Sequence, residues 1–380
     1  GRPVVSPNGR YLAYTQTTDI RQGYNGAKLT IRDLTTSESR SLTTDFDRSV
    51  SDIQWSQDSQ SLWISYTDLG MIRVAKIDLR GKLRQSDIVV GGTAIGRPYT
   101  SGSFSVGGKG RLAYTLGRDD RPADVALMRP GKTPLKLTDL NGDLMGQRQM
   151  TRAERITWPS SHDAMMIEGW VMKPPGFDPA KTYPMILEIH GGPHSAYGPN
   201  YSTEAQLFAA AGYVVLYTNP RGSTSYGEQF ANEIDLAYPG FDYDDLISGV
   251  DALIDQGYVD PEQLFVTGGS GGGVLTAWIV GKTDRFRAAV VAKPVINWAS
   301  FVLTADRNYF FATTWFDTPP WEDYESYWTR SPLSLVGNVS TPTMLLTGES
   351  DYRTPMSETE QYYQALKHRG IDTLMVRIPG

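Results

Sequence analysis

The chain of 380 residues contains no cysteine and only four histidines. Without cysteine there is no disulfide, no thiolate metal site and no cysteine nucleophile, so a reducing and an oxidising compartment fit equally well and the localisation stays unknown. The composition predicts no cofactor and no metal. Any histidine-dependent chemistry has to use one of four residues or a residue outside this sequence, and the four are His162, His190, His194 and His368.

Positive charge is also scarce, and long hydrophobic runs are absent. The 36 lysines and arginines face 42 carboxylates, which gives a net charge of −6. The chain therefore lacks the broad basic face that nucleic acids or acidic membranes require. No apolar stretch is long enough to span a bilayer. We expect neither nucleic acid nor membrane as a partner, and formation of a homo-oligomer stays open.

Residues 1–149 repeat a pattern of turns and short strands. An aromatic-rich strand recurs at Tyr14, Tyr66 and Tyr114, which lie 52 and 48 residues apart. A period near 50 with four short strands per unit is typical of β-propeller blades, and a three-hairpin meander is the alternative. Because propellers carry about four to eight blades, three blades cannot close a ring. We therefore predict part of a β-propeller and expect the sequence to begin inside a longer one.

From about Met150 strands begin to alternate with helical patterns, so residues 150–380 form a second predicted domain. This alternation predicts a mostly parallel, doubly wound sheet. The expected strands include 185–189, 264–266, 288–291, 343–347 and 373–378, and the expected helices are 203–211, 244–256 and 357–368.

One stretch of this domain carries a nucleophile. The run Gly268-Gly269-Ser270-Gly271-Gly272-Gly273 joins an apolar strand directly to an apolar helix. The frame Gly-x-Ser-x-Gly in that context is a nucleophile elbow, in which a tight turn lifts the serine hydroxyl above the sheet. A flexible glycine and serine linker would have the same composition, but a linker is not bounded by apolar residues on both sides. We predict Ser270 as the nucleophile.

A serine nucleophile requires an acid and a histidine that follow it along the chain. Asp351, just after the strand 343–347, is the predicted acid, and Glu349 is the weaker candidate. The histidine should follow the strand 373–378, where the sequence stops at Gly380. We therefore expect a fragment that ends before its catalytic histidine and is itself inactive. A pseudoenzyme is the alternative.

The oxyanion hole requires two backbone N–H groups. The first belongs to Gly271, directly after the serine. The second is assigned to Gly192 in the loop His190-Gly191-Gly192-Pro193, which follows an early strand. We expect His190 to support this loop rather than to act as the base.

Together these motifs resemble the prolyl oligopeptidase family of serine peptidases. The motifs are the loop 190–193, the segment 219–227, the elbow 268–273 and the segment 348–353, in the order that the family has. The resemblance implies an α/β-hydrolase fold preceded by a propeller, with peptides as substrates. In the prolyl oligopeptidase and dipeptidyl peptidase branches a tyrosine hydroxyl at the start of this loop takes part in the oxyanion hole. His190 occupies that position in this chain, so the resemblance favours the acylaminoacyl-peptidase-like branch.

The same resemblance assigns a substrate pocket to the aromatic-rich segment after the strand 288–291. Trp298, Phe301 and Phe310 are its candidate walls, which would favour apolar side chains, although each could equally pack as an ordinary lid on the core. The predicted function is a serine peptidase acting on short peptides through an acyl-enzyme. A carboxylesterase on the same fold and a catalytically dead interaction protein are the alternatives.

Overall fold

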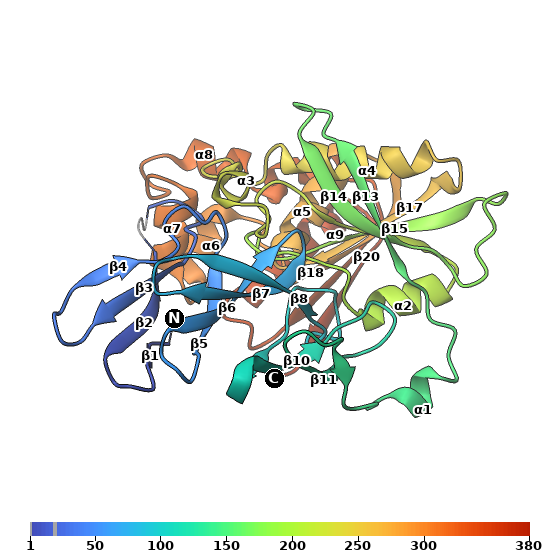
Figure 1. Ribbon diagram of the computed structural model, residues 1–380. Helices are drawn as coiled ribbons and strands as arrows, with labels where there is room; N and C mark the ends of the chain where they lie inside the picture. The colour runs from blue at the N-terminus through green and yellow to red at the C-terminus, as the bar shows by residue number, and fades with distance from the viewer. Residues whose placement is uncertain (1, 18–20) are drawn as a thin grey trace.

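The computed structural model describes residues 2–17 and 21–380. Its first part contains three four-stranded antiparallel sheets that follow one another along the chain (Figure 1). Their strands are β1 (Val4–Val5), β2 (Tyr11–Gln16), β3 (Lys28–Asp33), β4 (Ser39–Ser41), β5 (Val50–Trp55), β6 (Ser61–Asp68), β7 (Met71–Asp78), β8 (Leu83–Val90), β9 (Phe104–Gly107), β10 (Arg111–Leu116), β11 (Asp124–Met128) and β12 (Leu135–Lys136). A 3₁₀ turn, η1 (Gly108–Gly110), joins β9 to β10.

The second sheet is buried on both faces because the other two pack against it. Leu62 and Ile64 on β6 join the apolar cluster shared with the first sheet. Trp63, between them, points to the opposite face and joins the cluster shared with Leu112 and Tyr114 of the third sheet. This alternation along one strand is how stacked blades share their cores.

The second part of the chain is built on an eight-stranded mixed sheet in the order β13-β14-β16-β15-β17-β18-β19-β20. The strands are β13 (Ala153–Pro159), β14 (Met166–Met172), β15 (Tyr183–Ile189), β16 (Val214–Asn219), β17 (Val259–Gly269), β18 (Phe286–Ala292), β19 (Thr343–Gly348) and β20 (Thr373–Ile378). Strands β15 to β20 pair in parallel, and β13 and β14 form an antiparallel edge. The sequence reasoning did not anticipate β13.

Helices cover both faces of this sheet. Helix α2 (Thr203–Ala210) packs on the face that carries Trp170 and Tyr217. The opposite face is covered by α4 (Asp242–Ile254), α5 (Gly271–Lys282) and α9 (Met356–His368), which enclose the largest apolar cluster of the chain's described part. The short helices α1 (Gly142–Met145) and α3 (Glu228–Asn232) lie in connections. No helix within the described ranges is both long and apolar enough to cross a membrane.

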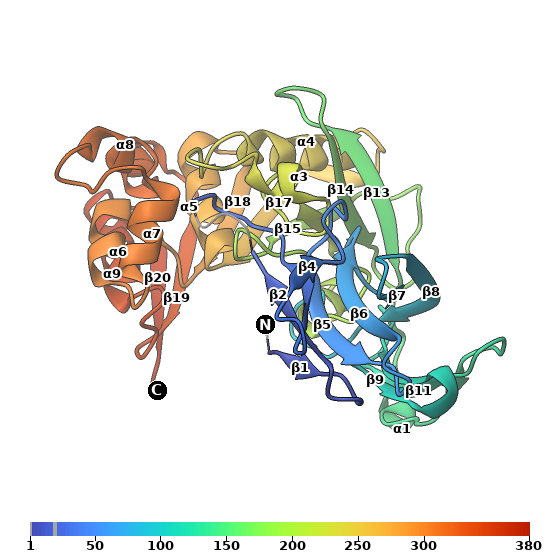
Figure 2. The ribbon, with the colours of Figure 1, turned by 60° about the vertical axis from the view of Figure 1, so that its left-hand side comes forward.

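The segment between β18 and β19, which the sequence marks as rich in aromatic residues, is helical. It contains α6 (Trp298–Thr304), α7 (Asn308–Trp315), α8 (Tyr324–Thr329) and a 3₁₀ turn, η2 (Pro332–Asn338). These helices gather at the β19–β20 end of the large sheet, away from the β13–β14 edge (Figure 2). They are therefore next to the carboxyl ends of the strands that carry the site.

The two parts of the chain touch through polar contacts. Arg97 of the first part forms a two-pronged ion pair with Glu204, with distances of 2.7 and 3.1 Å. The backbone N–H of Gly70 donates to Ser225 Oγ at 2.8 Å, and Tyr99 pairs as an isolated antiparallel bridge with Tyr197. These contacts bring segments of the first part to the edge where β15 ends.

Candidate active site

Ser270 lies at the predicted elbow between β17 and α5. Its φ of 59° and ψ of −120° fall in a region that is strained for a residue with a side chain. The turn is held because the Ser270 N–H donates to the Ala292 carbonyl at 3.0 Å. A Cβ on Gly272 would collide with the carbonyl oxygen of Ile189, so the close approach of α5 to β15 requires glycine there. The elbow thus presents one hydroxyl above the sheet.

The two predicted oxyanion donors lie beside each other. A Cβ built on Gly271 would be 3.0 Å from the backbone nitrogen of Gly192. Gly271 is the first residue of α5, and the first N–H groups of a helix have no partner inside it. The Gly192 N–H has no hydrogen-bond partner within residues 2–17 and 21–380. Two backbone donors next to Ser270 are an arrangement that can stabilise a developing oxyanion.

The predicted acid, Asp351, is fixed in the loop after β19. Its Oδ1 accepts hydrogen bonds from the backbone N–H groups of Arg353 and Thr354 at 3.0 and 2.9 Å, and its Oδ2 accepts one from the Thr354 hydroxyl at 3.0 Å. The weaker candidate, Glu349, forms an ion pair with Arg377 at 3.0 Å instead. Asp351 is therefore the carboxylate of this loop that is held by backbone donors.

None of the four histidines is hydrogen bonded to Ser270 or Asp351, and all four belong to the described ranges. His190 is buried, and its ring nitrogens lie 2.8 Å from the Gly191 carbonyl and 2.9 Å from the Ser223 hydroxyl. Burial lowers the pKa of His190 to about 4, so it stays neutral and braces the loop.

The other three histidines have different surroundings. The Nδ1 of His194 lies 2.9 Å from the Gly222 carbonyl, burial lowers its pKa, and its ring stacks on Trp315. His162 stacks on Phe241 and His368 ends α9 at the surface.

The end of β20 lies beside the loop of Asp351. The Glu349 N–H donates to the carbonyl of Ile378 at 2.9 Å, and the carbonyl oxygen of Gly380 is 3.9 Å from a Cβ built on Gly348. Residues that follow β20 therefore leave the sheet next to the predicted acid.

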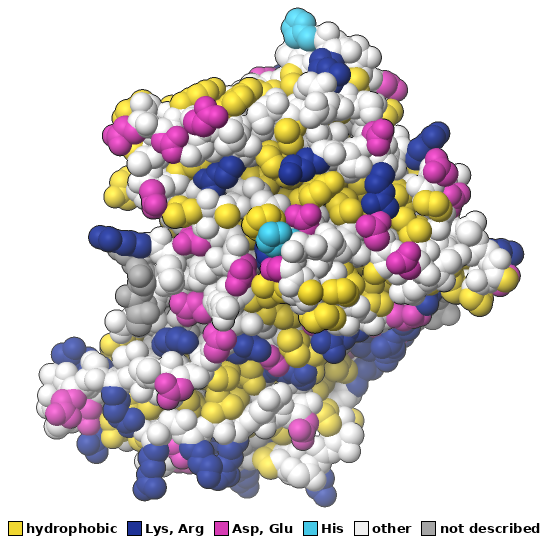
Figure 3. All heavy atoms as spheres, turned by 90° about the horizontal axis from the view of Figure 1, so that it is seen from above, with side chains coloured by type: hydrophobic (Ala, Val, Ile, Leu, Met, Phe, Trp, Pro, Cys, Tyr) yellow, Lys and Arg dark blue, Asp and Glu magenta, His cyan; other side chains and the backbone are white. Residues whose placement is uncertain are grey.

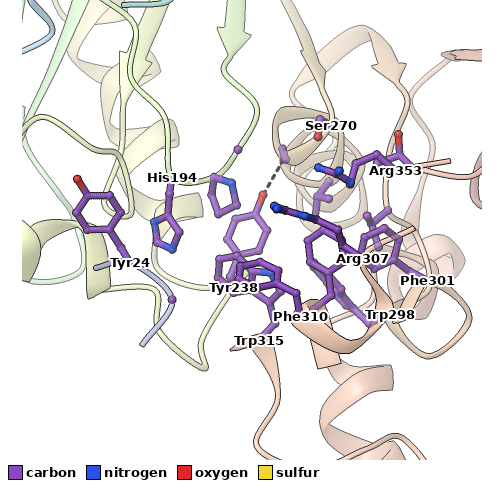
Figure 4. Close-up of a pocket in the computed structure, with 18 of the residues that line it drawn as sticks. Tyr24, His194, Tyr238, Ser270, Trp298, Phe301, Arg307, Phe310, Trp315 and Arg353 are labelled. Carbon is purple, nitrogen blue, oxygen red and sulfur yellow. Dashed lines mark hydrogen bonds between the residues drawn. The ribbon is translucent and has the colours of Figure 1, made fainter. Parts of the chain in front are cut away.

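A cavity of about 480 Å³ opens at Ser270. All three predicted wall residues line it, and they are Trp298, Phe301 and Phe310 (Figure 4). Trp298 and Phe301 are also part of the buried core, whereas Phe310 is exposed. Trp298 and Phe301 therefore both pack in the core and border the cavity, and their role in a substrate pocket stays a prediction.

The cavity also contains residues that the sequence reasoning missed. Tyr238 lines it and donates a hydrogen bond to the Gly271 carbonyl at 2.7 Å, which is the contact drawn in Figure 4. Arg307 and Arg353 bring positive charge, and residues 23–25 of the first part of the chain form one wall. Arg353 is the last residue of the motif 348–353, whereas no local motif identifies the others, because the fold brings them together from distant segments.

A buried polar cluster connects the first part of the chain to the oxyanion loop. The Gly191 N–H donates to the Tyr99 hydroxyl at 2.8 Å. The Tyr197 hydroxyl donates to Glu188 at 2.6 Å, and Arg97 lies 3.3 Å from the same carboxylate. Burial raises the pKa of Glu188 to about 7 even though Arg97 is adjacent.

The face of the molecule seen in Figure 3 carries side chains of both charges. On the face seen in Figure 3, carboxylates and basic side chains are interspersed with exposed hydrophobic ones over most of the area. No group of three or more histidines and carboxylates that could hold a metal ion occurs within the described part of the chain.

Three comparisons with known proteins agree that the chain is similar to peptidases. Residues 199–380 match the model of the prolyl oligopeptidase family. The chain is 38% identical to the peptidase YuxL of Bacillus subtilis over 328 residues, which are 86% of this chain and 49% of that protein. It is 27% identical to dipeptidyl-peptidase 5 of Aspergillus fumigatus over 391 residues, which cover 99% of this chain and 53% of that protein. The chain thus spans about half the length of these relatives.

The acylaminoacyl peptidase of Pyrococcus horikoshii has a similar structure. The TM-score is 0.85 at 25% sequence identity, over 99% of this chain and 58% of that one. This likeness confirms the predicted fold class, an α/β-hydrolase fold preceded by part of a β-propeller.

Proposed function

We propose that this chain, whose residues 199–380 belong to the prolyl oligopeptidase family, carries the nucleophile, acid and oxyanion hole of a serine peptidase that cleaves short peptides. The observation that carries the proposal is the placement of Ser270 at a strained elbow, beside the N–H groups of Gly192 and Gly271 and at the opening of an apolar cavity. Substrate binding and transition-state stabilisation would then meet at one hydroxyl.

In the proposed reaction Ser270 Oγ attacks the carbonyl carbon of the peptide while a histidine takes the hydroxyl proton. The carbonyl oxygen becomes an oxyanion and accepts hydrogen bonds from Gly192 and Gly271. The histidine returns the proton to the leaving amine, which leaves an acyl-enzyme. Water repeats the sequence and releases the acid. Asp351 would orient the histidine and stabilise its charged form.

The base is proposed to follow β20 and to be none of the four histidines of this sequence. His190 uses one ring nitrogen in a contact with Gly191 and the other in a contact with Ser223, and the end of β20 is adjacent to the loop of Asp351. We therefore expect residues 1–380 alone to show only residual turnover, since loss of one triad member removes most of the catalysis. A longer polypeptide with a histidine after Gly380 should be active, and full turnover by residues 1–380 would make His194 the next candidate.

The walls of the cavity favour an apolar side chain before the scissile bond. Phe310 exposes the most apolar area of the three predicted wall residues, Trp298 and Phe301 lie behind it in the buried core, and each Å² that a ligand buries contributes roughly 25 cal/mol. The similarity to an acylaminoacyl peptidase adds that short peptides with blocked amino ends are candidate substrates, whereas the similarity to dipeptidyl-peptidase 5 favours free amino ends.

A substrate panel on the intact protein tests this proposal. Chromogenic amides with Ala, Leu, Phe or Lys before the scissile bond are assayed with free and with acetylated amino ends. We expect Phe and Leu to be cleaved fastest. A preference for Lys would contradict the apolar pocket. Turnover of simple esters without amide cleavage would establish the carboxylesterase, and no turnover at all would favour the interaction protein.

A further inference from the structure

The cavity at Ser270 contains two arginines and no carboxylate among the described residues that line it. The arginines are Arg307, which precedes α7, and Arg353, which follows the Asp351 loop. The remaining lining is apolar, backbone or uncharged polar, apart from His194, whose lowered pKa favours its neutral form. This excess of positive charge contrasts with the net charge of −6 of the whole chain.

The two arginines differ in their partners. Arg353 forms a bidentate ion pair with Asp306, with nitrogen–oxygen distances of 2.6 and 3.2 Å. The positive charge of Arg353 is therefore compensated within the protein. The guanidinium of Arg307 forms no hydrogen bond and no ion pair with any residue of the described ranges, although Asp306 is its neighbour in the chain. Its defined contact is with the Phe310 ring, whose centre lies 5.6 Å from the guanidinium carbon.

The orientation of Arg307 places its charge where a substrate would lie. In Figure 4 the nitrogen-bearing ends of Arg307 and Arg353 both point toward the space between Tyr238 and Ser270, with Trp298 and Phe301 on the far side. The planar guanidinium carries several donors in a fixed fork that matches a carboxylate. A guanidinium that has no ion pair within the described residues and points into a cavity (Figure 4) is suited to bind such a group.

We propose that Arg307 forms a carboxylate-binding subsite of this cavity. The inference rests on the proposed peptidase function and adds to it a substrate that carries a negative charge near the scissile bond. Two sources share this chemistry. One is the terminal carboxylate of a short peptide, which would restrict cleavage to bonds close to the carboxyl end. The other is the side chain of an aspartate or glutamate.

Binding measurements separate the two sources. The intact protein with Ser270→Ala, which binds without turnover, is titrated calorimetrically at low ionic strength with two pairs of peptides. The first pair is acetyl-Ala-Phe-Ala with a free carboxylate or with a carboxamide. The second pair is acetyl-Ala-Glu-Ala-amide or acetyl-Ala-Gln-Ala-amide. We expect the charged member of one pair to bind about tenfold more tightly, which is the size of one charge-assisted hydrogen bond, and the preference should weaken as salt is added.

Variants assign the effect to one side chain. Arg307→Gln should remove the preference, and Arg307→Lys should keep part of it. Arg287→Gln is the matched control, because Arg287 is also exposed and has no hydrogen bond or ion pair within the described part of the chain, but does not line the cavity. Equal binding within both pairs, or a preference that survives Arg307→Gln, would overturn the subsite and leave the peptidase proposal intact. Absence of binding by all four peptides would overturn both.

Discussion

Replacement of Tyr99 by phenylalanine should weaken the oxyanion loop from a distance of 92 residues along the chain. The Tyr99 hydroxyl accepts the N–H of Gly191, a buried residue directly before Gly192. Phenylalanine keeps the edge-to-face contact with the Tyr197 ring, whose centroid lies 4.7 Å away, and removes the hydroxyl, which also interacts with the Tyr197 side chain. The variant thus removes the acceptor of the Gly191 N–H while it keeps the packing of the ring.

The expected size follows from the cost of an unpaired buried donor. Leaving the Gly191 N–H without a partner costs roughly 1–3 kcal/mol. Part of this cost should be relieved by a shift of the loop that moves the Gly192 N–H. We then expect kcat to fall by about tenfold, which is less than the 10²–10³-fold fall that complete loss of an oxyanion donor causes. KM should stay nearly constant, because the walls of the cavity are unchanged. The assay is steady-state kinetics on the intact protein together with urea unfolding.

Tyr217→Phe is the matched control for this measurement. The Tyr217 hydroxyl is buried and has no hydrogen-bond partner within residues 2–17 and 21–380, so its removal should leave stability unchanged or raise it. The reasoning would be refuted if Tyr99→Phe left both kcat and unfolding free energy unchanged, or if Tyr217→Phe were equally harmful.

Two further perturbations concern buried charges. Burial raises the pKa of Glu188 from 4.5 to about 7. Between these two pH values the folded protein keeps a proton on Glu188 that the unfolded chain has released. The contribution of Glu188 to the unfolding free energy therefore falls as the pH rises from about 4.5 to 7. Glu188→Gln should remove this dependence on pH. The unfolding free energy of the variant should therefore rise relative to that of the native protein by about 1–3 kcal/mol between pH 5 and pH 8. Identical pH slopes of the two proteins in urea unfolding would contradict this prediction. Asp245→Ala leaves the buried Arg221 without the carboxylate at 2.9 Å, which should cost about 3–5 kcal/mol; a loss below about 1 kcal/mol would show that Asp163 compensates.

The features that the sequence could predict are those that local patterns encode. The glycines around Ser270 identify it in the sequence, because the close contacts at positions such as Gly272 leave no room for a side chain. Helix α9 and strand β20 can be predicted from the periodicity of their apolar residues. Asp351 was found because chain order and the end of a strand define it together. The assignment of Ser270 and Asp351 to catalysis stays a prediction.

The features that the sequence could not predict depend on tertiary contacts. Tyr99 meets Gly191 only because the first part of the chain docks at the end of β15. The sequence does not show which of Arg307 and Arg353 is paired with a carboxylate. The structure distinguishes them, because Arg353 forms an ion pair with Asp306. The edge strand β13 pairs antiparallel with β14 and has no helix between the two strands. It therefore lacks the alternation of strands and helices from which the other strands were predicted.

Covalent labelling at Ser270 tests the central claim most directly. The intact protein is treated with a fluorophosphonate probe, and the modified peptide is identified by mass spectrometry. We predict a single adduct on Ser270 and complete loss of labelling in the Ser270→Ala variant, because a serine that an adjacent base activates attacks phosphorus much faster than an ordinary hydroxyl. Labelling that persists in Ser270→Ala, or an adduct on another residue, would contradict the assignment of the nucleophile.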